Sequence, residues 1–308
     1  THSQKKFIDS MEYYNLGPAR SKEKKSPLTS KEATGYRSIL GGLQWACHSR
    51  ADHCAECSRL QGKRNSPTVE DMCDANALLK RCKATASEAV LKFRTQSNKP
   101  KRLLIFPDAS LNSVNKKDSK TGVTTEQKRT QAGWVILLTD DTETLDTGNA
   151  HVLNWVSRKL TRVAKSTLSS EAIARIGAVE DAIRIAGWLE ELYNVELTTK
   201  QLIVMQESTG FSIPIDVVTD ARALHEVIVS PMEPKPKDPG CLLWIKWLRE
   251  GHQKNILRRP IWTSTVDMLG DGLTKDKDNT ELRQLFSTGR VRSRYAILVR
   301  TAIVDGYK

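Results

Sequence analysis

The spacing of apolar residues predicts that the first third of the chain is mainly helical. Ile39 and Leu43 lie four residues apart on one helical face, and Thr29 stands where a helix cap is expected. A second apolar pattern of helical period runs through 69–91. Residues 1–26 are rich in Lys and show little apolar periodicity, so they are expected to form an exposed arm.

A polar segment marks a change of pattern near residue 100. Residues 96–102 are polar and include Pro100, and the apolar spacing is helical before them and strand-like after them. We therefore place a domain boundary there. Residues 1–100 form a basic, mainly helical region, and residues 101–308 form an α/β domain with a C-terminal tail.

Three strands are expected at the start of the second region. Residues 103–106, 132–139 and 152–156 are short runs of β-forming residues, and the polar segment 112–129 between the first two is expected to be a loop. Successive strands of this kind form hairpins. A long amphipathic helix is then expected to begin at Ser169-Ser170 and to end at Tyr193.

Strand-like and helical segments alternate in the remainder of the chain. A strand is expected at 213–220, helices at 221–229 and 242–250, another strand at 256–262, and a final helix from residue 264 onward. The order is βββαβαβα with one extra helix before the last strand. This order indicates an α/β fold with a mixed sheet.

Composition and charge narrow the class of protein. The 308 residues are 39% hydrophobic and 27% charged, which is typical of a globular chain with a sizeable core. The formal net charge is +12, of which +8 falls in residues 1–100, so an anionic partner such as nucleic acid is expected.

Other features of the sequence bound the protein's location. No long uncharged apolar run is present, and the six cysteines are too few for a disulfide scaffold, so we expect a soluble, intracellular protein with reduced thiols and no membrane partner. The chain begins at Thr1 rather than Met, which indicates a piece of something longer.

Four acidic residues occupy positions where α/β proteins gather their chemistry. Asp108 and Asp220 each close a predicted strand, Glu171 lies in the first turn of the long helix, and Asp271 lies in the helix after the last strand. Side chains at the carboxyl ends of strands converge, so these four carboxylates are expected to form one cluster.

A cluster of carboxylates favours a divalent cation. Like charges a few ångströms apart repel and raise each other's pKa, and hard oxygen ligands select Mg²⁺ or Mn²⁺. Two such ions roughly 3.5–4 Å apart can drive phosphodiester hydrolysis. The structural alternative stays open, because Asp108 and Asp220 can serve as turn or cap residues and Glu171 can favour the helix dipole.

Five segments around these acids form an ordered set of motifs. They are Phe106-Pro107-Asp108-Ala109-Ser110, Trp155-Val156-Ser157-Arg158-Lys159, Thr167-Leu168-Ser169-Ser170-Glu171-Ala172, Val218-Thr219-Asp220-Ala221-Arg222-Ala223 and Leu269-Gly270-Asp271-Gly272-Leu273-Thr274-Lys275. In this order, over roughly residues 101–285, they resemble the motifs of the ribonuclease H (RNase H) domain in copia-type LTR retrotransposon polyproteins.

The resemblance implies a fold, an activity and a set of site residues. It implies an RNase H-like fold with a five-stranded mixed sheet, and two-metal cleavage of the RNA strand of RNA–DNA hybrids with Mg²⁺ or Mn²⁺. The catalytic, metal-holding acids would be Asp108, Glu171, Asp220 and Asp271. Basic residues near them are expected to hold phosphates. These residues are Arg158, Lys159, Arg162, Lys165 and Arg222.

The first hundred residues are similar to the segment that closes the copia-type reverse transcriptase. The similarity lies in Tyr36-Arg37-Ser38-Ile39-Leu40-Gly41-Gly42-Leu43-Gln44-Trp45, Ser49-Arg50-Ala51-Asp52, Ser66-Pro67-Thr68 and Leu79-Lys80-Arg81. The paired polymerase aspartates are absent, so no polymerase activity is expected. The reverse transcriptase portion of the same polyprotein would be a partner, and the location would be cytoplasmic, in a virus-like particle, or nuclear.

The sequence departs from the family pattern at Pro107 and Ala51, and in the length of the segment 112–129. The fourth carboxylate also has a competitor, because Asp267 lies one helical turn before Asp271. The Asp-x-Leu-Thr-Lys context favours Asp271.

Two other functions remain open from sequence. A decayed or domesticated fragment would bind nucleic acid through its basic residues without cutting it. A DNA nuclease of the transposase or integrase type would share the fold and the acids, but the reverse-transcriptase-like segment upstream disfavours it.

Overall fold

The computed structural model describes the chain except for residues 118–123, 143–147, 163, 276–279 and 292–308, and the side chains of 112–129 also lie outside the description. The predicted C-terminal tail is therefore largely outside the described residues. The helices are α1 (Lys5–Ser10), α2 (Ser30–Ala46), α3 (Cys54–Gln61), α4 (Val69–Ala84), α5 (Thr167–Tyr193), α6 (Thr199–Val204), α7 (Arg222–Val229), α8 (Leu242–Gln253) and α9 (Thr280–Thr288). None of these helices is both long and apolar enough to cross a membrane.

The helices of the first region form where polar caps precede apolar faces. Thr29 caps α2, since its hydroxyl accepts the Glu32 N–H at 3.3 Å while the Glu32 carboxylate accepts the Thr29 N–H at 2.7 Å. Thr68 and Asp71 form the same reciprocal cap on α4. The mainly helical character predicted for this region is confirmed.

Most of the first ten residues are exposed, as predicted, but Gln4 and Ile8 are buried, so this segment packs on the helices and is not a free arm. Ile8 of α1 is fully buried against the α2–α4 core. The short strand β1 (His2–Ser3) also pairs with β2 (Val90–Leu91). The segment carries only one deeply buried apolar residue, Ile8, so the periodicity was too sparse to predict that it packs.

The second region is built on a six-stranded sheet of order β7-β6-β3-β4-β5-β8. The strands are β3 (Lys101–Lys117), β4 (Thr124–Asp140), β5 (Gly148–Lys159), β6 (Ile215–Thr219), β7 (Arg259–Trp262) and β8 (Arg290–Val291). The strands β3, β4 and β5 form an antiparallel meander, whereas β6 and β7 run parallel to β3. The sheet is mixed, as expected, and β8 adds a sixth, two-residue strand at one edge.

The first hairpin is much longer than the sequence predicted. β3 and β4 pair continuously from Lys101 opposite Asp140 to Lys117 opposite Thr124, so most of the segment 112–129 is strand rather than loop. Asp108 consequently lies within β3 and does not close it. The sequence of this extension is polar, so it resembles a loop.

The long helix α5 begins earlier than expected, at Thr167. The hydroxyl of Ser166 accepts the N–H of Ser169 at 3.1 Å and caps the helix. The serines at 169 and 170 are therefore inside the helix, and Glu171 lies in its second turn rather than its first.

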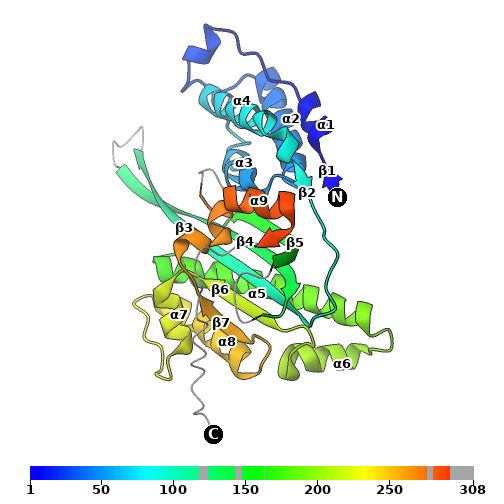
Figure 1. The fold of residues 1–308 in the computed structure, drawn as a ribbon. Coiled ribbons are helices and arrows are strands. Elements are labelled where there is room, and N and C mark those ends of the chain that lie inside the picture. Colours follow the sequence, from blue (N-terminus) through cyan, green and yellow to red (C-terminus); the bar gives the residue numbers. More distant parts are fainter. Residues whose placement is uncertain (118–123, 143–147, 163, 276–279, 292–308) are drawn as a thin grey trace.

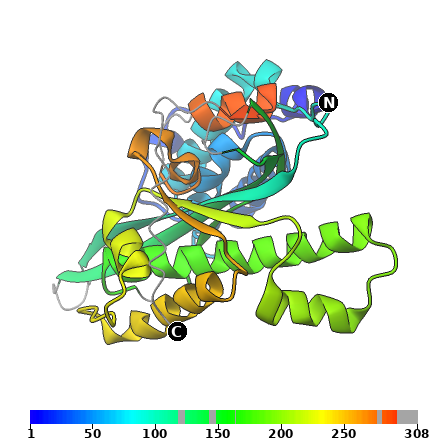
Figure 2. The same cartoon turned by 60° about the horizontal axis from the view of Figure 1, so that its bottom comes forward.

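Helical layers cover both faces of the sheet (Figure 1). Leu103, Ile105 and Trp134 of one face pack against α5, α7 and α8 in one apolar cluster. Leu104, Phe106 and Val135 of the other face pack against α9 in a second cluster. The helix α6 folds back alongside the C-terminal half of α5, which extends past the sheet (Figure 2).

The N-terminal helices pack beside α9 on the second face (Figure 1). The Trp155 indole N–H donates to the Cys47 carbonyl at 3.0 Å, and the Gln131 amide donates to the Ser58 hydroxyl at 3.0 Å. Residues 8–89 also have a buried cluster of their own. The domain boundary near residue 100 remains a prediction.

A buried ion-pair network ties together the starts of β3, β6 and β7. Asp216 is fully buried and pairs with Arg102 at 3.1 Å and with Arg258 at 2.6 Å. Arg258 also bonds both carboxylate oxygens of Asp141, at 2.7 and 2.8 Å. This network lies at the opposite end of β6 from Asp220, which follows the strand's last residue.

Candidate active site

The four predicted acids come from four separate elements. Asp108 lies in β3, and Asp220 directly follows the parallel neighbour β6. The pairing of Ile105 with Val217, continued three residues along both chains, sets these two acids side by side. Glu171 comes from α5, and Asp271 from the 3₁₀ turn η7 (Leu269–Leu273).

Three of these acids are buried, and each of the three accepts a hydrogen bond, that of Asp271 coming from the Lys275 ammonium. Asp108 is 2% exposed, and its carboxylate accepts the hydroxyl proton of Thr274. Glu171 is 6% exposed and accepts the backbone N–H of Ala109. Asp271 is also buried, whereas Asp220 is half-buried.

The acids act on one another electrostatically. Burial, together with the charges of Asp271 and Asp220, raises the pKa of Asp108 to about 6, although the bond from Thr274 opposes the shift. Burial, with the charges of Asp108 and Asp220, raises the pKa of Glu171 well above its ordinary value. All four carboxylates thus belong to one electrostatic group.

Glycines let the turn η7 pass close over the sheet. A Cβ at Gly270 would lie 2.6 Å from the Phe106 carbonyl oxygen and 2.9 Å from the Asp108 Cβ, and a Cβ at Gly133 would lie 2.5 Å from the Leu273 Cβ. The Ser157 hydroxyl donates to the Leu273 carbonyl at 2.5 Å. These approaches carry Asp271 to the side of Asp108.

The structure separates Asp271 from its competitor Asp267. The expected helix from residue 264 is instead two short 3₁₀ turns, η6 (Thr265–Asp267) and η7, with Met268 in an extended conformation between them. The two aspartates therefore do not share the face of one helix. The charge of Asp271 is among the causes that raise the pKa of Asp108, and the choice of Asp271 as the fourth acid remains a prediction.

Lys275 is a residue of this site to which the sequence analysis gave no role. Its ammonium lies 2.5 Å from an oxygen of Asp271. Burial alone would lower the pKa of Lys275, but its bond to Asp271 and the charges of Asp108, Asp271 and Asp220 raise it. The one indication of this contact in the sequence is the i, i+4 spacing between Asp271 and Lys275.

The donor chemistry fits a divalent metal, but the ligands are not assembled as a closed site. The four carboxylates are hard oxygen donors, and a cation would relieve the repulsion that raises the pKa of Asp108 and Glu171. Across the part of the chain that the structure describes, no three His, Cys, Asp or Glu side chains form a ready-made metal site. The ammonium of Lys275 supplies the positive charge at Asp271 instead.

The five predicted phosphate-binding residues are all at least partly exposed. Arg158 stacks on the Trp134 ring at 4.9 Å from its centroid, and Arg162 lies 5.9 Å from the Trp244 ring. Arg158 and Lys159 end β5, and Lys165 immediately precedes the Ser166 cap of α5. Arg222 is exposed on α7 and pairs with Glu226 at 2.7 Å.

Arg175, one helical turn after Glu171, is an unusual buried cation. It is fully buried, and its three guanidinium nitrogens have no hydrogen-bond partner among the described residues. Burial lowers its pKa to about 9, although the charge of Glu171 opposes the shift. A buried guanidinium without hydrogen-bond partners lowers the free energy of unfolding, unless its charge stabilises a neighbouring group.

Replacing Arg175 with Met is therefore expected to stabilise the protein. Removal of a buried, unpartnered charge with retention of an apolar stem should raise the free energy of unfolding by about 1–4 kcal/mol. Urea unfolding checks this, with the exposed Arg184→Met on the same helix as the control. A destabilised Arg175→Met protein would show that the guanidinium has partners that offset its burial.

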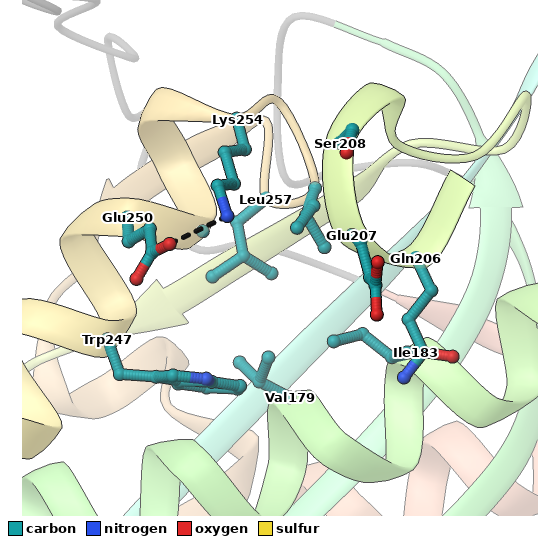
Figure 3. Close-up of a pocket in the computed structure, with 11 residues that line it drawn as sticks. Val179, Ile183, Gln206, Glu207, Ser208, Trp247, Glu250, Lys254 and Leu257 are labelled. Atoms are coloured by element: carbon teal, nitrogen blue, oxygen red, sulfur yellow. Dashed lines mark ion pairs between the residues drawn. The ribbon is translucent and has the colours of Figure 1, made fainter. Parts of the chain in front are cut away.

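A pocket of about 410 Å³ lies apart from the carboxylates (Figure 3). Val179 and Ile183 of α5 form one wall, and Trp247 with the ion-paired Glu250 and Lys254 forms another. None of the four acids lines it. A second pocket of about 260 Å³ includes Asp271, but apolar side chains such as Leu269 and Leu282 form much of its lining. Asp108, Glu171 and Asp220 thus lie outside the lining of both pockets.

The chain matches no protein-family model and no curated protein. Solved structures similar to it include three RNase H proteins. The N-terminal RNase H domain of a Mycobacterium tuberculosis protein, fused to maltose-binding protein, is 14% identical, with 56% of this chain and 89% of that chain covered and a TM-score of 0.32.

The second, LC11-RNase H1, which was isolated from compost by a metagenomic approach, is 14% identical, with 56% and 91% covered and a TM-score of 0.32. The third, RNase H1 of the archaeon Halobacterium salinarum NRC-1, is 12% identical, with 53% and 85% covered and a TM-score of 0.27. From the order and directions of its strands, the second region of the chain has an α/β fold with a mixed sheet.

Proposed function

We propose that the chain is a metal-dependent endoribonuclease that cleaves the RNA strand of RNA–DNA hybrids. The observation that supports this most strongly is the joining of Asp108, Glu171, Asp220 and Asp271 into one electrostatic group from four elements of the fold. Acids that only cap helices or form turns lie at separate places in a fold, whereas catalytic acids lie together in one site. Strongly shifted pKa values are also concentrated at catalytic sites.

In this proposal the surrounding fold fixes the positions of Asp108 and Glu171. Asp108 is fixed by β3 and by Thr274, and Glu171 by the N–H of Ala109. Two Mg²⁺ or Mn²⁺ ions held by the four acids would activate a water molecule and stabilise the leaving oxygen of the cleaved phosphodiester. Burial of Asp108 and Glu171 excludes bulk water from the carboxylate oxygens.

The substrate class is inferred from charge and from the resemblance in sequence. The net charge of +12 and the exposed residues Arg158, Lys159, Arg162 and Lys165 favour a phosphate backbone as the partner. The ordered motifs around the acids resemble copia-type RNase H domains. We therefore assign the chain to the retrotransposon polyprotein context, next to a reverse transcriptase, and expect the corresponding cytoplasmic or nuclear location.

The test is cleavage of end-labelled duplexes by the whole chain. With Mg²⁺, we expect an RNA–DNA hybrid to be cut in its RNA strand, duplex DNA of the same sequence to remain intact, and EDTA to abolish cleavage. Restoring Mg²⁺ or Mn²⁺ in excess of EDTA should restore the activity. Cleavage that persists in EDTA contradicts the metal-dependent mechanism, and preferential cutting of duplex DNA favours the integrase-type alternative.

One observation favours a second candidate, a nucleic-acid-binding protein without nuclease activity. The Lys275 ammonium already neutralises Asp271, and no metal site is preformed among the described residues. This candidate predicts binding of hybrid that weakens with salt and does not change in Asp108→Asn. It also predicts no cleavage of hybrid by the unmodified protein at any Mg²⁺ or Mn²⁺ concentration.

A further inference from the structure

A lysine ammonium lies among the candidate catalytic acids. Lys275 Nζ is 2.5 Å from Asp271 Oδ1, and the charges of Asp108 and Asp220 also act on it. Asp271 is buried, whereas the side chain of Lys275 is 38% exposed. The lysine therefore reaches the acids from the solvent side of the site.

The backbone at Lys275 is held firmly on the sheet. The Ser110 hydroxyl donates to the Thr274 carbonyl at 3.0 Å, and the Thr274 hydroxyl bonds to Asp108. The Lys275 N–H donates to the Asp271 carbonyl at 3.1 Å. With its backbone fixed and its side chain partly exposed, the ammonium can leave Asp271 for solvent without unfolding the turn.

We propose that Lys275 is the internal counter-ion of the carboxylate site, which stabilises the acids in the metal-free protein and is displaced when a divalent cation binds. This inference rests on the proposed function. In this role Lys275 sets the affinity of the site for the metal, because a binding ion must compete with the ammonium for Asp271. Lys275 is thus a positioning residue for the acids.

The expected direction follows from charge alone. Removing the ammonium leaves the same acids with a more negative potential, so a divalent cation should bind more tightly. The metal-free protein should lose stability, because the acids then repel one another with no cation nearby. An ordinary i, i+4 surface pair would alter neither metal affinity nor the stability gained from metal.

The experiment is calorimetric titration of MnCl₂ into the full chain without nucleic acid. We expect Lys275→Met to lower the Kd for Mn²⁺ by about tenfold relative to the unmodified protein. Lys275→Arg retains the charge and should keep the Kd within about twofold. The matched control is Lys254→Met, since Lys254 forms an i, i+4 pair with Glu250 at 2.7 Å at the end of α8, away from the acids.

Thermal unfolding gives a second readout that does not depend on activity. Without metal, Lys275→Met should melt at a lower temperature than the unmodified protein, and its gain in Tm on adding Mn²⁺ should be larger. If Lys275→Met does not fold without metal, Lys275→Gln and refolding in the presence of Mn²⁺ provide the same comparison.

The outcomes separate this inference from the proposed function. Equal Kd values for the unmodified protein and Lys275→Met overturn the counter-ion role and leave the metal site standing. Binding of Mn²⁺ by Lys275→Met alone supports the inference, because the lysine then blocks the site. Failure of both proteins to bind Mn²⁺ overturns the proposed metal site and the inference together.

Discussion

Replacing Asp108 with Asn will reduce the rate of RNA–DNA hybrid cleavage by about 10³-fold or more. Asp108 is the acid on which Asp271 and Asp220 both act, and it lies between β6 and the turn η7. Asparagine keeps the shape and can still accept the Thr274 hydroxyl proton, but it removes the negative charge that a divalent cation needs. A loss of this size corresponds to about 4 kcal/mol in the barrier. The measurement is single-turnover cleavage of labelled hybrid with Mg²⁺.

The control for Asp108→Asn is Asp267→Asn. Asp267 is the nearby aspartate that the structure places in a separate turn, so its replacement should keep the rate within about threefold of that of the unmodified protein. Cleavage by Asp108→Asn at the unmodified rate would contradict the catalytic role of Asp108. A large loss in Asp267→Asn with none in Asp271→Asn would show that Asp267 is the fourth acid.

The second large effect is expected from Asp216→Ala, on the stability of the fold. Asp216 is fully buried and pairs with Arg102 and Arg258, and Arg102 is itself fully buried. Burial lowers the pKa of Arg102, and the charge of Asp216 offsets part of that shift. Without Asp216, the buried guanidinium of Arg102 has no counter-charge from β6, and we expect a loss of about 3–5 kcal/mol in the free energy of unfolding.

Urea unfolding of the whole chain, followed by its tryptophan fluorescence, measures this loss. The control is Asp9→Ala, because Asp9 forms an exposed i, i+4 pair with Lys5 and should change stability by less than about 0.5 kcal/mol. A loss below about 1 kcal/mol in Asp216→Ala would show that the arginines find other partners.

Periodicity in the sequence predicted those elements that bury one face against a core. The helices α2 and α4 were predicted because Ile39, Leu43, Ala75 and Leu78 repeat at helical spacing and lie in one buried cluster. The long helix α5 was predicted for the same reason. Its first residue was not, because several hydroxyl-bearing residues precede Glu171 and the cap is decided by the geometry at Ser166.

Elements whose sequence lacks a regular apolar pattern were beyond prediction. The outer part of the β3–β4 hairpin is polar, and the segment after residue 264 alternates Asp and Gly with apolar residues, which suits both a helix and two tight turns. In the structure the segment forms two turns, and the backbone of Gly270 lies so close to β3 that a Cβ there would be 2.9 Å from the Asp108 Cβ.

The acids of the candidate site were predictable from the sequence, but the two cations near them, Lys275 and Arg175, were not. The sequence predicted that Asp108 and Asp220 converge at strand ends, and the structure adds that their strands β3 and β6 are parallel neighbours. Lys275 and Arg175 each lie four residues after an acid, which in a sequence indicates an ordinary surface ion pair. Only the structure shows that one enters the acid cluster and that the other is buried.

Crystals of the whole chain soaked in MnCl₂, with anomalous diffraction recorded at the manganese edge, test the central claim most directly. We predict two manganese peaks in contact with carboxylate oxygens of Asp108, Glu171, Asp220 and Asp271, with the Lys275 ammonium moved off Asp271. Soaked crystals with no manganese at these four acids, and with Lys275 still bonded to Asp271, would contradict it.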